Sequence, residues 1–211
     1  MSKQPNIRKT NQSNQGFTLI EVLVATAITV ILGAGFLGMQ YIFSSNQVSA
    51  WKSYYNVDEA NRVASQLTKE LRNIQESEDG SFPISTALDQ EIIFYSDVNQ
   101  DGDVDRVRYT LAGTTLTKGV TAPTDTPLSY DPLNEKVQTL TDNIRNGIAP
   151  LFYYYNNAWP FDTINNPLSS TNRIADTKHI KVYLRTNIKI DDADNDFIIE
   201  SEANLRSLRK S

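Results

Sequence analysis

Between Val22 and Phe43 the chain runs for 22 residues without a charged side chain, and only Thr26, Thr29 and Gln40 are clearly polar. A helix needs about 20 predominantly apolar residues to cross the hydrocarbon core of a bilayer. A secretory signal peptide has a shorter apolar region, followed by a cleavage site of small residues. The run therefore predicts a single membrane-spanning helix.

The flanks of this run differ sharply in charge. Lys3, Arg8 and Lys9 precede it, and the first sixteen residues contain no acid. This bias predicts that the N-terminus stays in the cytoplasm. Glu21 stands at the front edge of the run, where an unpaired carboxylate in lipid costs several kcal/mol. A plain single-pass anchor needs no such acid, so Glu21 indicates a functional role.

The stretch that contains Glu21 has a recognisable pattern. Gly16 is followed by FTLIEVLVA, residues 17–25, and preceded by the basic segment. The combination of a glycine, an aromatic residue, a nearby glutamate and a continuing apolar helix resembles the processing site of type IV pilins and type II secretion pseudopilins. The resemblance covers residues 1 to about 45.

The resemblance implies a processing pathway and a set of partners. A membrane aspartyl protease, the prepilin peptidase, would cut between Gly16 and Phe17 on the cytoplasmic side and then methylate the new amine of Phe17. Glu21 would neutralise the N-terminal amine of a neighbouring subunit during filament assembly, since two buried charges are tolerable as a pair and costly apart. The implied partners are the membrane, the peptidase, other pilin or pseudopilin subunits and the inner-membrane assembly platform.

The helix is expected to continue beyond the membrane. Apolar residues recur at spacings of three and four at Ala60, Val63, Ala64, Leu67, Leu71 and Ile74. This spacing places them on one face of an amphipathic helix, which the sequence predicts to stop near Ser77–Gly80. The expected organisation is a leader at 1–16, a transmembrane and assembly helix at 17–43, its amphipathic continuation at 44–79, and a globular head at 80–211.

The head has the short β-type runs of an antiparallel sheet. EIIFYS (91–96) and VDRVRYTL (104–111) flank a polar turn and predict a hairpin. Further strands are expected at 137–144, 151–155, 180–186 and 197–205, with loops at 119–134 and 156–176. The predicted fold class is α+β: a long N-terminal helix, transmembrane in its first half, packed on an antiparallel sheet, as in pilins.

The turn of the predicted hairpin is rich in acids. Its candidate metal ligands are Asp97, Asn99, Asp101, Asp103 and Asp105. Acid or amide residues at positions 1, 3, 5 and 9, with Gly102 at position 6, match the first part of an EF-hand calcium loop. Position 12 is Arg108, where that loop has a glutamate. The sequence thus predicts a calcium-binding hairpin, with a solvated turn as the alternative; a second acidic run, 191–196, is a weaker candidate to supply ligands.

Composition narrows the function. The chain has no cysteine, which excludes a disulfide scaffold and a thiolate metal site. Its net charge of −5 argues against nucleic acid as the main partner, although a role in DNA uptake stays open. His179 is the only histidine and no catalytic motif is present, so we expect no enzyme. Two functions remain. The first is a structural subunit, a minor pilin or pseudopilin, which begins as a single-pass protein of the inner membrane and ends in an extracellular or periplasmic filament. The second is a membrane-anchored, calcium-dependent protein that binds a glycan, a surface or DNA.

Overall fold

The chain divides into two compact units, Met1–Ser49 and Ala50–Ser211. A computed structural model describes residues 16–125, 127–187 and 196–205. The first helix, α1 (Leu19–Arg72), contributes residues to both units. Within the first unit, the segment Leu19–Val48 is long and apolar enough to cross a membrane. The predicted membrane-spanning helix is thus matched by a helix of suitable length and composition.

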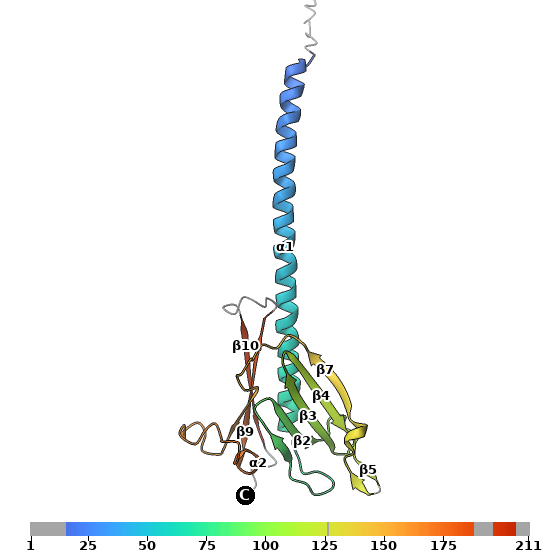
Figure 1. The fold of residues 1–211 in the computed structure, drawn as a ribbon, viewed down its shortest axis with the longest axis vertical. Coiled ribbons are helices and arrows are strands. Elements are labelled where there is room, and N and C mark those ends of the chain that lie inside the picture. Colours follow the sequence, from blue (N-terminus) through green and yellow to red (C-terminus); the bar gives the residue numbers. More distant parts are fainter. Residues whose placement is uncertain (1–15, 126, 188–195, 206–211) are drawn as a thin grey trace, which may run out of the picture. The chain divides into compact units, whose positions relative to one another are not determined.

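The head, which is the unit Ala50–Ser211, contains antiparallel sheets (Figure 1). The five-stranded sheet has the order β1-β2-β3-β4-β7 and comprises β1 (Ile84–Ala87), β2 (Glu91–Ser96), β3 (Asp105–Ala112), β4 (Thr115–Thr121) and β7 (Lys136–Thr141). The three-stranded sheet has the order β10-β9-β8 and comprises β10 (Phe197–Asn204), β9 (His179–Thr186) and β8 (Phe152–Tyr155). The smaller elements are β5 (Thr124–Asp125), β6 (Leu128–Ser129), the 3-10 helix η1 (Pro132–Asn134) and α2 (Arg173–Asp176).

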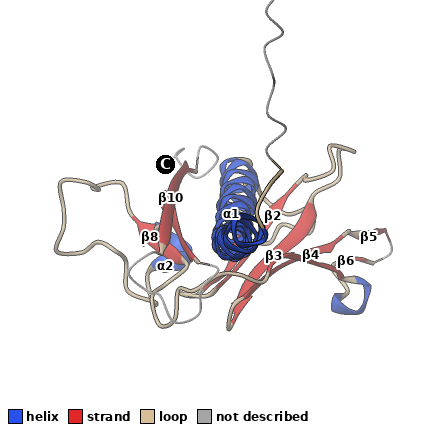
Figure 2. Cartoon of the chain, turned by 90° about the horizontal axis from the view of Figure 1, so that it is seen from above, coloured by secondary structure: helices blue, strands red, loops and turns tan. Residues whose placement is uncertain are grey.

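The part of α1 that belongs to the head lies between the two larger sheets (Figure 2). On one side the Thr68 hydroxyl donates to the Ser201 hydroxyl at 2.9 Å, from α1 to β10. On the other side the Lys118 ammonium of β4 donates to Glu70 of α1 at 2.6 Å. The apolar face predicted from helical spacing, Ala60 to Ile74, is buried at every predicted position. The predicted α+β fold class is confirmed.

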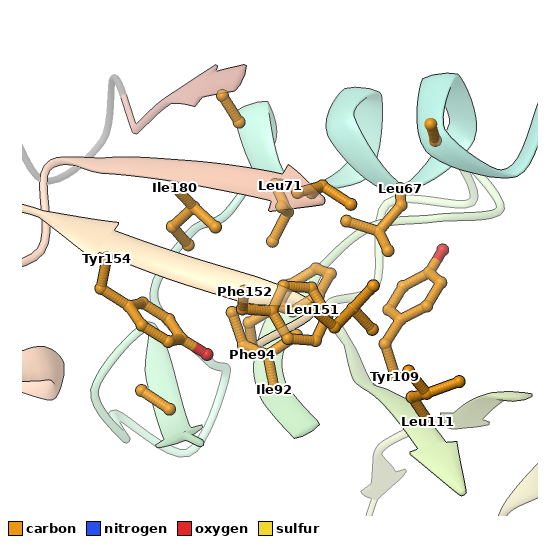
Figure 3. Close-up of a cluster of buried hydrophobic side chains, with 14 of the residues drawn as sticks. Leu67, Leu71, Ile92, Phe94, Tyr109, Leu111, Leu151, Phe152, Tyr154 and Ile180 are labelled. Atoms are coloured by element: carbon orange, nitrogen blue, oxygen red, sulfur yellow. The ribbon is translucent and has the colours of Figure 1, made fainter. Parts of the chain in front are cut away.

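The core of the head forms where the helix meets both sheets (Figure 3). Its largest fully buried side chains include Leu67 and Leu71 from α1, Phe94, Tyr109, Phe152 and Tyr154. The rings of Phe94 and Tyr109 stack across β2 and β3 with centroids 6.1 Å apart. Each such side chain contributes roughly 1.5–3 kcal/mol on burial. Tyr154 of β8 is fully buried and so serves packing.

The structure corrects three expectations about the elements of the fold. The helix ends at Arg72 rather than near Gly80, because the backbone N–H of Gln75 donates to the Tyr95 carbonyl at 3.0 Å and draws the chain into contact with β2. The segment expected to be loop from 119 to 134 contains the end of β4 and the short pair β5–β6. The strands also divide between two larger sheets rather than one.

The carboxylate of a neighbouring ion pair occupies the space beside Gly119 in β4. The Arg108 guanidinium donates to the Glu135 carboxylate at 2.8 and 2.5 Å, and this hydrogen bonding lowers the pKa of Glu135. A Cβ at position 119 would lie 2.2 Å from Glu135 Oε1. We expect Gly119→Ala to displace Glu135 from Arg108 and to lower the unfolding free energy by about 1 kcal/mol, measured by thermal unfolding of the full-length protein.

The matched control for this prediction is the same substitution in a Glu135→Ala background. Without the Glu135 carboxylate, the three atoms nearest to the methyl group added at position 119 are absent, and the substitution should cost much less. An equal loss of stability in both backgrounds would contradict the role given to Glu135.

Candidate functional site

The predicted cleavage position lies at the entrance to α1. Residues 16–18 precede the helix, which begins at Leu19. Gly16 and Phe17 are both exposed, and 88% of the Phe17 side chain surface is accessible. Segments outside helices and sheets are the usual substrates of proteolysis. The Gly16–Phe17 bond is therefore presented in an accessible, non-helical segment, while the rest of the leader, residues 1–15, lies outside the described residues.

Glu21 caps the start of its own helix. Its Oε2 accepts hydrogen bonds from the Thr18 backbone N–H at 2.9 Å and from the Thr18 hydroxyl at 2.8 Å. In return the Glu21 N–H donates to the Thr18 hydroxyl at 3.4 Å. This reciprocal arrangement is a capping box, which satisfies backbone donors that a helix N-terminus leaves unpaired. The Thr-x-x-Glu pattern of residues 18–21 is the sequence signal for this cap, which neither hydropathy nor the pilin resemblance indicates.

The helix around Glu21 carries a continuous apolar surface. Side chains from Phe17 to Val48 are exposed within the described chain, and the apolar window is 0% buried. Soluble monomers rarely expose apolar patches of more than a few hundred Å². Such a surface is typical of a segment that lipid or other protein chains cover.

The second candidate site is the Asp-rich loop, residues 97–105, which joins β2 to β3 (Figure 1). The carboxylate of Asp97 accepts the backbone N–H of Gln100 at 2.6 Å and that of Gly102 at 3.2 Å. Gly102 has a φ of 100°, a left-handed conformation that favours glycine. Asn99 Nδ2 donates to Asp101 Oδ2 at 2.6 Å. Asn99 and Asp101 thus contact each other, while the Asp97 carboxylate holds the backbone of the loop.

Asp105, the first residue of β3, is the buried acid of the loop. Only 2% of its surface is exposed, and its Oδ2 has no hydrogen-bond partner. Burial, aided by the charges of Asp101 and Asp97, raises the pKa of Asp105 to about 6, although the Val98 backbone N–H and the Lys118 ammonium oppose this rise. A carboxylate in this setting is destabilised in its charged form.

The fold brings two further residues to this loop that the sequence analysis did not identify. Glu78, from the connection after α1, accepts the Val104 backbone N–H at 3.0 Å. The Tyr130 hydroxyl donates to the Val104 carbonyl at 2.7 Å. Neither residue is close to the loop in sequence, so no local pattern could have indicated them.

Two other parts of the sequence-based calcium prediction are the twelfth position of the loop pattern and the second acidic run. Arg108, at the twelfth position of the loop pattern, pairs with Glu135 and Glu91. Among the residues that the structure describes, no group of three or more His, Asp or Glu side chains is already placed to hold a metal ion. In the second acidic run, residues 191–195 lie outside the described part of the chain, and Asp196 pairs with Arg185 at 3.4 Å.

Comparisons with known proteins bear on the N-terminal segment. A chain from the crystal structure of the GspK-GspI-GspJ complex of the type 2 secretion system of enterotoxigenic Escherichia coli aligns at a TM-score of 0.44 and 14% identity, over 71% of this chain and 97% of that chain. No curated protein matches. The family model for the prokaryotic N-terminal methylation motif matches residues 11–37, which include Gly16, Phe17 and Glu21. The resemblance found in the sequence is thus confirmed for this segment: residues 11–37 carry the prokaryotic N-terminal methylation motif.

Proposed function

We propose that this chain is a subunit, minor rather than major, of a type IV pilus-like or type II secretion filament. The observation that carries the proposal is the position of the methylation motif, at the start of a helix whose apolar surface is uncovered from Leu19 to Val48. In a filament, the helices of neighbouring subunits cover such a surface. Before assembly, the inner membrane does so.

Processing is the first step of this function. The prepilin peptidase cuts the Gly16–Phe17 bond on the cytoplasmic side of the inner membrane and methylates the amine of Phe17. The exposed, non-helical segment at 16–18 supports this step, because a protease must draw its substrate into an extended conformation. The processed chain then meets the assembly platform, and the head lies on the outer side of the membrane.

The decisive measurement is the intact mass and N-terminal sequence of the protein recovered from the membranes of its own cells. We expect a chain that begins at Phe17 and carries one additional methyl group. A chain that still begins near Met1, in cells with an active peptidase, would overturn the proposal. The membrane-anchored binding protein would then be the better description.

Gly16→Val is the matched variant for this measurement. Gly16 does not have a positive φ, and a Cβ at this position meets no atom within 4 Å. The substitution should therefore leave the fold unchanged while it blocks cleavage by the peptidase. Normal processing of this variant would mean that Gly16 is not the residue that the peptidase recognises.

A further inference from the structure

The Asp-rich loop buries an acid without supplying enough partners for it. Asp105 is almost fully buried and accepts the Val98 backbone N–H, while its Oδ2 is without a hydrogen-bond partner. Burial of a charged group costs far more than burial of a neutral one unless hydrogen bonds or an opposite charge compensate. Because Val98 belongs to the loop, the carboxylate of Asp105 lies against the loop backbone. A cation bound within the loop would supply the missing partner.

The loop can surround such a cation from several sides. Asp97, Asn99 and Asp101 alternate along it, so that their side chains can converge on one point while Gly102 provides the sharp turn. The carboxylate oxygens of Asp97 and Asp101 now accept backbone N–H groups, and Asp101 Oδ2 also accepts the side-chain amide of Asn99. A carboxylate oxygen has more than one lone pair, so these bonds leave room for an ion after changes of side-chain rotamer.

Glu78 provides the carboxylate that the loop itself lacks. An EF-hand loop ends with a bidentate glutamate at position 12, but here that residue is Arg108, which binds Glu135. Glu78 Oε1 lies 3.0 Å from the Val104 nitrogen, at position 8 of the loop. It approaches from the connection after α1 and is exposed, so its side chain is free to turn toward an ion.

We propose that the Asp-rich loop binds one Ca²⁺ ion. Its ligands are the side chains of Asp97, Asn99, Asp101, Asp105 and Glu78. The backbone carbonyl of Asp103, at position 7, adds a further oxygen.

The donor set selects the metal. Every ligand is an oxygen, which suits a hard cation and not zinc or copper. Ca²⁺ accepts six to eight oxygen ligands in flexible geometry, whereas Mg²⁺ demands a near-ideal octahedron and retains its waters. A loop that must rearrange its side chains around the ion therefore suits Ca²⁺ and not Mg²⁺. Because the ligands are not already assembled, we expect a dissociation constant on the order of 10⁻⁴ M, in the range of extracellular calcium modules.

The test is calorimetric titration of CaCl₂ into the full-length protein in detergent, together with Tb³⁺ luminescence excited through tyrosine. Tyr130, whose hydroxyl bonds to Val104 of the loop, is a suitable donor of excitation. We expect one saturable Ca²⁺ site, Tb³⁺ luminescence that CaCl₂ displaces, and much weaker competition from MgCl₂. Asp105→Asn should weaken binding by about tenfold or more, and Glu78→Gln by about threefold, since affinity follows ligand charge.

Asp142→Asn is the matched control, because Asp142 is an exposed acid of the head just after β7 and its substitution removes the same charge. This variant should bind Ca²⁺ as the unaltered protein does. Absence of a saturable site would overturn the proposal, and so would unchanged affinity in both Asp105→Asn and Asp97→Asn. An equal loss of affinity in Asp142→Asn would overturn it too, since it would show diffuse attraction to an acidic surface. The site consists of head residues alone, so these outcomes do not depend on the filament function.

Discussion

Replacing Glu70 with alanine should lower the unfolding free energy of the head by about 3 kcal/mol, a typical cost of removing one partner of a buried ion pair. Glu70 Oε1 accepts the Lys118 ammonium at 2.6 Å and the Gln66 amide at 3.0 Å. Its Oε2 accepts the Tyr109 hydroxyl at 2.7 Å. Burial and the adjacent carboxylate raise the pKa of Tyr109, so the phenol stays protonated and remains a donor.

The large effect follows from the group that the substitution leaves behind. Lys118 is 8% exposed and would be left without the carboxylate that compensates its ammonium group. Thermal unfolding of the full-length protein should show a midpoint lower by roughly 6–12 °C for a head of this size. The double variant Glu70→Gln with Lys118→Met removes both charges and retains the acceptor for Tyr109. It should recover most of the loss.

The pair joins α1 to β4, so its energy also reports on how the helix is held in the head. A loss of less than about 1 kcal/mol in Glu70→Ala would place the pair among screened surface contacts. It would mean that the apolar face of α1, and not this polar link, fixes the helix between the sheets. A loss that the double variant does not recover would instead mean that the unpaired charge of Lys118 is not its cause, since the glutamine still accepts the Tyr109 hydroxyl.

The elements with strong local periodicity could be predicted from the sequence. Leu67 and Leu71 were placed in the core from their spacing, because the geometry of a helix alone decides which residues share a face. The strand Glu91–Ser96 was predicted with its observed bounds, since its run of β-branched and aromatic residues ends at a turn-forming aspartate. In both cases the signal lies within a few residues of the element.

The elements that depend on distant partners could not be predicted from the sequence. Strand β1 has no counterpart among the predicted strands, and the predicted hairpin stops before β4 begins. The threonines and Gly119 of β4 give it no clear alternation, and its position depends on pairing with β3 and β7. The helix end at Arg72 is likewise set by Gln75 and its contact with β2. Tertiary hydrogen bonds overrode the local signals there.

The candidate sites likewise have features that could be predicted from contiguous sequence and features that depend on distant residues. The methylation motif was readable because it is contiguous, and so was the calcium pattern of the Asp-rich loop. The burial of Asp105 and the approach of Glu78 could not be read from the sequence. They arise only when the turn after α1 and the β2–β3 hairpin come together. The sequence therefore indicated where an ion could bind, but not which acid completes the ligand set.

Glu21→Val should leave membrane insertion intact and reduce incorporation into filaments by roughly 100-fold. The reduction follows if Glu21 neutralises the amine of Phe17 in a neighbouring subunit, because a charge left unpaired in lipid costs about 3 kcal/mol and each 1.4 kcal/mol is about a factor of ten. Insertion should not suffer, since the substitution makes the segment more apolar. The measurement compares the variant in sheared filaments with the variant in washed membranes.

The capping box makes Glu21→Gln the variant that distinguishes two roles of this residue. Glutamine at this position can still accept the Thr18 N–H and so keep the cap, but it carries no charge to pair with an amine. If charge pairing drives assembly, Glu21→Gln should fail as Glu21→Val does, while Thr18→Ala, which keeps the acid, should assemble nearly normally. Normal assembly of Glu21→Gln together with failure of Thr18→Ala would assign Glu21 to the start of α1. The acid would then act within its own chain and not between subunits.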